Sequence, residues 1–179
     1  MKKTLFVICA FLFCCALRAE EIFFENATEE QSDFLVQFAM DSNAVYGYRT
    51  ISEEEARDFF HLCKHNFEKG IVRLMKGPSG IMGFYGLARH SDKEDGAWVN
   101  LLTHLFLKPK FIGQGYGKML FQDAMRTARE ELHWEALFWE SDPNAAWFYE
   151  KMGAKHVGEN PCNLNPDYRA PIFVYILNP

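Results

Sequence analysis

A glycine-rich segment between a long apolar run and an amphipathic stretch is the feature that most constrains the fold of this chain. Residues 98–107 are largely apolar, Pro109 follows them, and three glycines then fall within five positions, at Gly113, Gly115 and Gly117. The run is typical of a central strand buried on both faces, and proline ends such a strand because it lacks the amide that the ladder needs. We therefore predict a strand, a loop and a helix in direct succession.

The predicted loop exposes backbone amides at the start of a helix. Glycine adopts a positive φ without steric cost, and the first turn of a helix carries unpaired N–H groups at the positive end of its dipole. This arrangement predicts a pyrophosphate-binding loop, with a purely structural tight turn as the alternative. The segment is not a P-loop, since Met119 rather than Ser or Thr follows Lys118. The loop residues are Ile112, Gly113, Gln114, Gly115, Tyr116, Gly117 and Lys118.

The length of 179 residues is that of one domain, and 49% hydrophobic and 16% aromatic residues are enough for one core. Hydrophobic periodicity predicts the order β-α-α-β-β-β-α-β-α-β-β, without a repeat or a long linker. We expect a single-domain α/β fold in which helices cover the faces of a mixed sheet. The predicted strands span residues 22–25, 71–75, 81–88, 98–107, 135–140, 155–158 and 172–177, and the predicted helices span 29–42, 52–70, 115–132 and 144–152.

Two capping boxes mark the starts of the first two predicted helices, Thr28 with Gln31 and Ser52 with Glu55. Apolar residues at helical spacing predict one buried face on each of the three longest helices. The predicted core positions are Phe34, Leu35, Phe38 and Ala39, then Ala56, Phe59, Phe60, Cys63 and Phe67, and then Met119, Leu120, Ala124, Met125 and Ala128.

The first nineteen residues have the composition of a secretory signal peptide. Lys2 and Lys3 precede an apolar run over residues 5–17, which is shorter than the roughly 20 residues that span a bilayer as a helix. We predict cleavage after Ala19, one domain over residues 20–179, and no stable membrane span after cleavage. The protein is then exported or secreted; otherwise it is cytoplasmic or anchored in the inner membrane.

Charge and cysteine usage narrow the possible ligands. The net charge of −5 and the pI of about 5.7 provide no basic field that would neutralise nucleic-acid phosphates. No metal-ligand spacing is present, so we expect neither a nucleic-acid partner nor a metal. Beyond the predicted leader the cysteines are Cys63 and Cys162, and this number decides neither for nor against a disulfide.

A second motif follows at residues 141–154, with the sequence Ser-Asp-Pro-Asn-Ala-Ala-Trp-Phe-Tyr-Glu-Lys-Met-Gly-Ala. With the strand, loop and helix before it, this motif resembles the GNAT superfamily of N-acetyltransferases. That family has a Gln/Arg-x-x-Gly-x-Gly/Ala loop between a strand and a helix, then a strand and Asn-Ala-x-x-Phe-Tyr-x-Lys-x-Gly-Phe. The resemblance covers most of the chain after the leader. It implies a mostly antiparallel central sheet flanked by helices, and acetyl-CoA as cosubstrate.

The resemblance assigns the cofactor-binding positions outside the loop. The backbone of Phe106 and Leu107, at the end of the central strand, would pair with the pantetheine arm of acetyl-CoA like an added strand. Asn144 matches a family contact to the pantetheine, and Phe148 would pack beside it.

The loop itself departs from the family pattern at one position. Gly115 and Gly117 match the two required glycines, but Ile112 stands where the family usually has Gln or Arg. One phosphate contact of the family is therefore absent. Gln114 or Lys118 can supply another donor.

The resemblance also assigns a general acid. Tyr149 matches the tyrosine that protonates the departing thiolate in many family members, and its reference pKa of about 10 lies above that of a thiol. The base is open, because Leu101 and Thr103 stand where a carboxylate is expected. His104 is a possible base with a reference pKa of about 6.5, or a core histidine on the opposite face of the strand. Glu140 is no better supported.

We expect transfer of an acetyl group from acetyl-CoA to a primary amine of a small molecule or protein, by direct attack in a ternary complex. The alternative is a non-catalytic acyl-CoA-binding sensor or interaction domain, which Ile112 and the missing base favour. Tyr46 and Tyr48 are candidates for the acceptor pocket; the acceptor and the oligomeric state stay open. A leader conflicts with an intracellular cofactor unless the protein enters another cell, stays anchored facing the cytoplasm, or does not use the leader.

Overall fold

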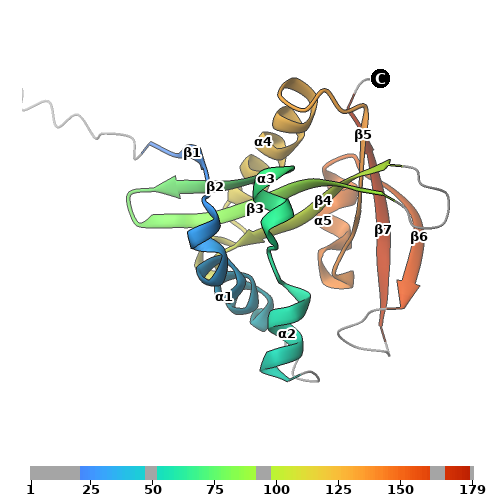
Figure 1. Cartoon of the computed structure of the whole chain (residues 1–179). Helices are drawn as coiled ribbons and strands as arrows, with labels where there is room; N and C mark the ends of the chain where they lie inside the picture. Colours follow the sequence, from blue (N-terminus) through green and yellow to red (C-terminus); the bar gives the residue numbers. More distant parts are fainter. Residues whose placement is uncertain (1–20, 47–51, 92–97, 162–167, 178–179) are drawn as a thin grey trace, which may run out of the picture.

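The computed structural model describes residues 21–46, 52–91, 98–161 and 168–177 (Figure 1). Its strands form one sheet in the order β1-β2-β3-β4-β5-β7-β6. The strands are β1 Phe23–Asn26, β2 Ile71–Gly77, β3 Gly80–Ser91, β4 Trp98–Leu107, β5 Ala136–Glu140, β6 Lys155–Pro161 and β7 Arg169–Ile176. The α-helices are α1 Ser32–Asn43, α2 Glu53–Phe59, α3 Lys64–Glu68, α4 Tyr116–Glu130 and α5 Ala146–Lys151. Short 3-10 turns are η1 Glu29–Gln31, η2 Ala44–Tyr46, η3 Pro109–Phe111 and η4 Pro143–Ala145.

Neighbouring strands of the sheet run antiparallel except β4 and β5, which are parallel. This confirms the predicted single α/β domain with a mixed, mostly antiparallel sheet. The β2–β3 hairpin turns at Pro78 and Ser79, and Gly80 permits the tight turn with a φ of +88°. The register of β3 against β4 shifts after Gly86, so that Thr103 is an extra, bulged residue of β4.

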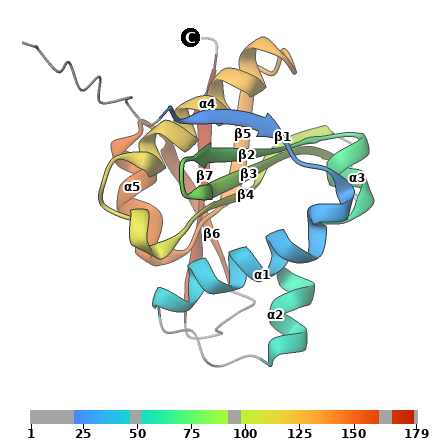
Figure 2. The same cartoon turned by 90° about the vertical axis from the view of Figure 1, so that its left-hand side faces the viewer.

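Helices cover both faces of the sheet, with α1 and α2 on one side and α4 on the other (Figure 2). Alternation along β3 decides which side chain meets which helix. Phe84 packs edge-on against Phe38 of α1, with 5.6 Å between ring centroids. Its neighbour Tyr85 faces α4, where its hydroxyl donates to Asp123 Oδ2 at 2.8 Å. Both residues of β3 are fully buried, so the centre of the sheet has a core on each face.

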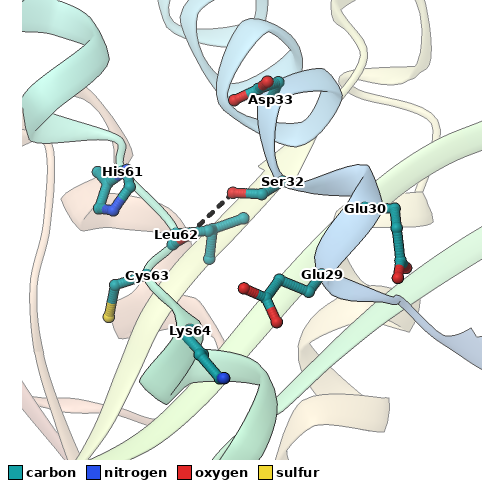
Figure 3. A pocket seen from close by; sticks show the side chains of 8 residues that line it. All are labelled: Glu29, Glu30, Ser32, Asp33, His61, Leu62, Cys63 and Lys64. Carbon is teal, nitrogen blue, oxygen red and sulfur yellow. Dashed lines mark hydrogen bonds between the residues drawn. The ribbon is translucent and has the colours of Figure 1, made fainter.

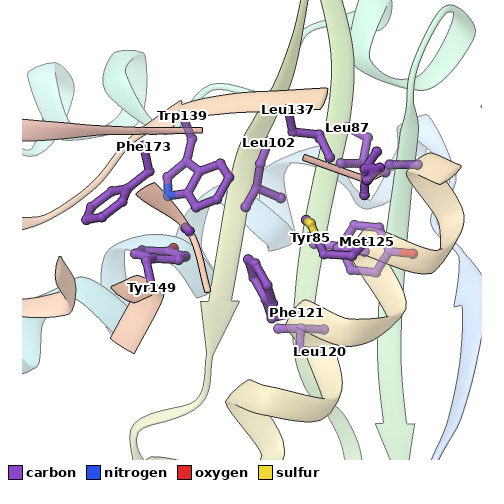
Figure 4. Close-up of a cluster of buried hydrophobic side chains, with 14 of the residues drawn as sticks. Tyr85, Leu87, Leu102, Leu120, Phe121, Met125, Leu137, Trp139, Tyr149 and Phe173 are labelled. Carbon is purple, nitrogen blue, oxygen red and sulfur yellow. The ribbon is translucent and has the colours of Figure 1, made fainter. Parts of the chain in front are cut away.

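Aromatic side chains form the core beside β5 (Figure 4). Trp139 of β5 lies 5.9 Å from Phe121 of α4 and stacks on Phe173 of β7 at 5.9 Å. Tyr149 of α5 completes the cluster, 5.1 Å from Trp139 and 5.6 Å from Phe173. All four side chains are buried. We refer to Phe121, Trp139, Tyr149 and Phe173 as the aromatic cluster; it holds α5 against β5 and β7.

A polar network joins β2, β3 and α4 on the same face of the sheet. Arg73 donates two hydrogen bonds to Glu131, both 2.9 Å, and one to Thr127 at 2.8 Å. The Tyr85 hydroxyl meets Asp123 and Thr127 at 2.8 Å each. The Arg73 side chain is only 12% exposed, and its hydrogen bonds with Glu131 raise the pKa of Arg73 and lower that of Glu131. We call these five residues the Arg73 network.

Several local signals are confirmed. The first capping box closes with a bond from Thr28 N to Gln31 Oε1 at 3.0 Å, and in the second Ser52 Oγ accepts from Glu55 N at 3.2 Å. The strand predicted over residues 98–107 has the same bounds in the structure. These features depend on neighbours in the sequence, which is why the sequence predicts them well.

The single helix predicted over residues 52–70 is wrong. The structure has two short helices, α2 and α3, separated by residues 60–63. Phe60 and Leu62 both turn into the core, at 5% and 2% exposure, and residues two positions apart cannot share one helix face. Ser32 Oγ donates to the Leu62 carbonyl at 2.8 Å, so this carbonyl is satisfied outside a helix. Tertiary packing therefore overrides the helical pattern here.

Three residues predicted for the core are exposed. Phe34 and Phe59 are each 49% exposed, and Met119 is 40% exposed. Each lies directly beside a residue that does reach the core, at the edge of a helix face. Phe121 of the same helix as Met119 is 2% exposed and is a core residue that the helical pattern did not include.

Some predictions fall outside the described residues, namely the leader over residues 1–19, Tyr48 and the possible disulfide partner Cys162. The Cys63 thiol donates to Asn66 Oδ1 at 3.0 Å. In the part of the chain that the structure describes, every helix is too short or too polar to cross a bilayer.

Candidate active site

The glycine loop leaves β4 through η3 and opens α4. Gly113 and Gly115 have φ values of +79° and +89°, a left-handed conformation that other L-residues rarely adopt. A Cβ atom at either position would have no atom within 4 Å, so open space adjoins both. Gln114 is exposed, and its Nε2 donates to the Lys110 carbonyl at 2.6 Å. The loop thus combines the backbone shape and the room that a close ligand requires.

The amides of this loop lie where turns lead into a helix. Residues 112–115 form turns, and the first bond of α4 runs from Met119 N to Gly115 O at 3.2 Å. Helix α4 has 15 residues, so its N-terminus carries the full positive end of a helix dipole. This geometry fits the phosphates of a CoA-type cofactor at the predicted loop.

Strands β4 and β5 separate soon after they meet. They pair through Leu101 and Phe138, and no second pair between them is described. Beyond this point β4 continues to Leu107. Its free edge can pair with an extended ligand in the way that an added strand would.

The two predicted backbone contacts at the end of β4 differ in orientation. Lys108 N donates to the carbonyl of Met82 in β3 at 2.8 Å. Because polar groups alternate along a strand, Phe106 also turns its backbone toward β3, and Leu107 turns to the opposite side. The Leu107 carbonyl accepts from Ser42 Oγ of α1 at 2.8 Å. Of the two residues, Leu107 therefore faces the side where a pantetheine would lie.

Phe148 connects the two motifs recognised in the sequence. Its ring lies 3.5 Å from where a Cβ at Gly117 would stand, so the start of α4 and the helix α5 are in contact. The ring also packs edge-on against Phe121 at 6.1 Å and Tyr149 at 5.1 Å. The structure thus brings the predicted general acid and the predicted phosphate loop to one place.

Tyr149 is buried in the aromatic cluster at 8% exposure. Burial raises its pKa, and the charges of Tyr46 and Asp142 raise it further. A phenol with a raised pKa stays protonated at neutral pH, so its O–H remains a hydrogen-bond donor. This is the protonation state that stabilisation of a departing thiolate requires.

Asp142 is a site residue that sequence reasoning missed. It lies just beyond the carboxyl end of β5 and caps η4, where its Oδ1 accepts from Asn144 N at 2.7 Å. Asp142 is half-buried, and its charge raises the pKa of both Tyr46 and Tyr149 after the effect of burial. Asn144 is exposed, and its predicted pantetheine contact stays a prediction. The sequence feature that could have identified Asp142 is the position of its carboxylate, just after the predicted strand that ends at Glu140.

His104 lies in the core between β4 and the α1–α3 side. It is 8% exposed, and its ring stacks on Phe84 at 6.0 Å. Its Nδ1 lies 3.0 Å from Thr103 Oγ1 and its Nε2 lies 3.4 Å from the Phe60 carbonyl. Burial lowers the pKa of His104 to about 4, with the charge of His61 adding to the effect. These contacts favour a core histidine over a general base.

A separate pocket lies at the other end of α1 (Figure 3). Its volume is about 410 Å³. It opens near Ser32, one helix length of about 15 Å from the Ser42 end of α1 that contacts β4. The described residues contain no group of three His, Cys, Asp or Glu side chains that could hold a metal ion. The pocket is lined by Glu29, Glu30, Ser32, Asp33, His61, Leu62, Cys63 and Lys64.

Comparison with known proteins identifies a domain and a fold. Residues 68–153 match the acetyltransferase (GNAT) domain. The structure resembles a GNAT-family acetyltransferase from Staphylococcus aureus Mu50, with 17% identity and a TM-score of 0.67 over 88% of this chain and 100% of that chain. It also resembles the PaiA N-acetyltransferase from Thermoplasma acidophilum in complex with coenzyme A, with 15% identity and a TM-score of 0.59 over 87% and 99% of the two chains.

A third similar structure is the IAA acetyltransferase from Bacillus cereus ATCC 14579, with 14% identity and a TM-score of 0.61 over 87% of this chain and 99% of that chain. A comparison with curated protein sequences gives no match. Identities of this size establish a shared fold, and the matched domain contains both motifs up to Gly153. With its glycine loop, its separating parallel strands and this domain match, the chain contains a GNAT acetyltransferase domain and has the GNAT fold.

Proposed function

We propose that this protein transfers the acetyl group of acetyl-CoA to a primary amine in a ternary complex. The observation that supports the proposal is the glycine loop between β4 and the 15-residue helix α4, beside the edge of β4 where pairing with β5 is described only at Leu101 and Phe138. The loop residues 112–118 would hold the pyrophosphate, and Leu107 would pair with the pantetheine. The acetyl thioester would then lie near Tyr149.

The reaction needs little covalent help from the protein. The acceptor arrives as R–NH₃⁺ and loses one proton to solvent or to a base, after which its nitrogen attacks the thioester carbonyl carbon. The C–N bond forms, the C–S bond breaks, the nitrogen loses its second proton to solvent, and the thiolate of CoA accepts a proton. Positioning two reactants in this way supplies up to about 7–11 kcal/mol of the barrier in the best cases. Tyr149 is the proposed donor to the thiolate.

A non-catalytic acyl-CoA-binding domain is the second candidate function. The absence of Gln or Arg at Ile112 and the low pKa of His104 favour it, because a histidine with a lowered pKa is a weak base. The two candidates differ in one measurable respect. A sensor binds acetyl-CoA without consuming it, whereas a transferase releases CoA only when an amine is present.

The test begins with calorimetric titration of the purified protein with acetyl-CoA, followed by thiol release in the presence of primary amines. The key variant is Gly113→Val with Gly115→Val, which places two β-branched residues at positive φ beside the proposed phosphates. Gly80→Val is the matched control, because Gly80 also has positive φ and open space but lies in the distant β2–β3 turn. We expect binding in the parent and in the control and a loss of at least about 100-fold in the loop variant.

Failure of the folded parent to bind acetyl-CoA would reject both candidate functions. Binding without amine-dependent thiol release, over a broad set of amines, would support the sensor. The variant Tyr149→Phe would then separate a role in catalysis from a role in binding acetyl-CoA, since it removes the hydroxyl donor and keeps the ring. For a transferase we expect kcat to fall about 10- to 100-fold while the Kd for acetyl-CoA is unchanged.

We also propose that residues 1–19 act as a leader, which rests on their composition alone. Fractionation of cells that express the full-length protein with a C-terminal tag tests it. A shortened product in the periplasm or medium would support export. A full-length product in the cytoplasm would show that the leader is not used.

A further inference from the structure

Trp139 has a buried hydrogen-bond donor that no atom of the described residues accepts. The side chain is 4% exposed, and its indole Nε1 has no partner within residues 21–46, 52–91, 98–161 and 168–177. An indole N–H can only donate, and a buried donor without a partner destabilises a fold because it has lost its hydrogen bond to water. A phenylalanine at this position would fill the core without that cost. The unpaired N–H therefore points to an acceptor that a ligand supplies.

Trp139 lies where the two parallel strands begin to separate. It directly follows Phe138, the β5 residue of the described pair with β4. Side chains alternate along a strand, so Trp139 turns to the face of the sheet that α4 and α5 cover. Its ring lies 5.9 Å from Phe121 of α4 and 5.1 Å from Tyr149 of α5. The donor is thus enclosed between both helices and the start of the opening.

A chain of ring contacts joins this donor to the glycine loop. The ring of Tyr149 lies 5.1 Å from that of Phe148, which in turn lies 3.5 Å from where a Cβ at Gly117 would stand. In Figure 4 the indole nitrogen of Trp139 is on the side of the ring toward Tyr149 and away from Leu102 of β4. The unpaired donor therefore faces the proposed general acid.

We propose that the Trp139 indole N–H donates to the carbonyl oxygen of the acetyl thioester, while the Tyr149 hydroxyl donates to its sulfur. This inference rests on the proposed acetyl transfer and adds a residue to its mechanism. A carbonyl oxygen matches the donor because it has two lone pairs and no proton. The thioester carbonyl is also the acceptor that acetyl-CoA has and CoA lacks.

The proposed hydrogen bond becomes stronger during the reaction. When the amine nitrogen attacks the carbonyl carbon, the C–N bond forms and the electron pair of the C=O π bond moves to oxygen, which becomes an oxyanion. The nitrogen loses its excess proton to solvent, the oxyanion forms C=O again, and the C–S bond breaks. The departing thiolate takes its proton from Tyr149, which regains one from solvent. A fixed donor shielded from water stabilises the oxyanion more than the initial carbonyl, so the barrier falls.

The direct test observes the indole N–H signals by NMR in full-length protein labelled with ¹⁵N in tryptophan. Acetyl-CoA and CoA are added separately without an amine, and calorimetry gives the Kd of each. We expect the Trp139 proton signal to move downfield with acetyl-CoA and to stay near its original position with CoA. Replacing Trp98, Trp134 and Trp147 by Phe in turn assigns the remaining signal to Trp139, so the assignment does not require a change at Trp139 itself.

The variant Trp139→Phe keeps an aromatic ring in the cluster and removes the donor. We expect kcat to fall about 100- to 1,000-fold while the Kd for CoA changes less than about twofold, the pattern of an interaction made mainly in the transition state. Trp134→Phe is the matched control, because Trp134 is buried in the same core at 6% exposure. Its kcat should stay within about threefold of the parent. Thermal unfolding checks that both variants fold, and the NMR test stands without them.

Four results would overturn the inference. Equal movement of the Trp139 signal with CoA and acetyl-CoA would assign the donor to a part of the cofactor that both share. An unmoved signal with acetyl-CoA bound would leave the N–H against the Tyr149 ring or a buried water. A folded Trp139→Phe variant with the kcat of the parent would remove the catalytic role. Absence of acetyl-CoA binding would contradict the proposed function itself, and this inference with it.

Discussion

The sheet of this protein consists of two parts that are stabilised by different means. Strands β1 to β4 are antiparallel, with long ladders between β2 and β3 and between β3 and β4, and the Arg73 network joins β2 and β3 to α4 through hydrogen bonds to charged groups. Strands β5 to β7 form shorter ladders, and the aromatic cluster joins them to α4 and α5. Between the two parts, the described pairing is limited to Leu101 and Phe138.

This difference explains how the proposed site can remain open without loss of stability. Each part has its own ladder and its own cluster of buried contacts, so neither depends on continuous pairing between β4 and β5. Helix α4 contributes to both, with Thr127 in the Arg73 network and Phe121 in the aromatic cluster. The free edge of β4 can therefore face a ligand while α4 keeps the two parts together.

Breaking the Arg73 network should have the largest effect on stability. Arg73→Met removes the hydrogen bonds to Glu131 and Thr127. Glu131 is 39% exposed, so the expected cost lies at the lower end of the range for a buried pair, at about 3 kcal/mol. Urea unfolding of parent and variant measures the change. Arg57→Met is the control, because its pair with Glu53 is exposed and should contribute less than about 1 kcal/mol. Equal effects of the two changes would contradict the proposed importance of the network.

Low pH should destabilise the part of the sheet formed by β1 to β4, because His104 of β4 is buried in its neutral form. Its pKa is about 4 in the folded protein and about 6.5 when unfolded, so only the unfolded chain binds this proton between these values. The contribution of neutral His104 to the free energy of unfolding is therefore complete above pH 6.5. As the pH falls toward 4, the free energy of unfolding decreases by up to about 3 kcal/mol. Unfolding free energies at about pH 7 and about pH 4 measure the loss.

The non-titrating variant His104→Gln isolates this effect. It should lose less stability than the parent over the same pH range, by about 2–3 kcal/mol. Its rate of acetyl transfer should stay within about tenfold of the parent if His104 is a core residue rather than the base. A larger fall in kcat with an unchanged fold would restore His104 as the base.

Disturbing the aromatic cluster should have a smaller effect. Phe173 is fully buried and touches both Trp139 and Tyr149, so Phe173→Leu loses two ring contacts at about 2 kcal/mol in total. Thermal unfolding measures the change. Ile176→Ala is the control on the same strand, because Ile176 is 50% exposed and should contribute less than about 0.5 kcal/mol. A smaller effect from Phe173 than from Ile176 would contradict the role of the cluster.

The smallest predicted effect distinguishes two glycines at the junction of the two parts. Gly115 has a φ of +89°, so Gly115→Ala should cost about 1 kcal/mol through backbone strain alone. Gly117 lies in the first turn of α4 with an ordinary φ, and an added Cβ would make normal contact with Phe148 at 3.5 Å. Gly117→Ala should therefore be neutral or slightly stabilising. Chemical unfolding of the two variants, compared with the parent, tests the difference in sign.

Much of this protein was predictable because it depends on local sequence. The central strand over residues 98–107, the glycine loop and both capping boxes follow from neighbours along the chain, and the structure has them where the pattern predicts them. Alternation, helical periodicity and turn chemistry act over a few residues, so a single sequence carries them in full. The family pattern also predicted that the glycine loop and the motif at residues 141–154 belong to one site.

Other features depend on which distant segments meet, and only the tertiary structure decided them. The sequence pattern of residues 52–70 is that of one helix, but burial of Phe60 and Leu62 divides it in two. The acidity of His104 depends on its burial against Phe84 and not on its own segment. The aromatic cluster brings together side chains from α4, β5, α5 and β7. Charge and desolvation act through space, and the sequence alone does not contain those distances.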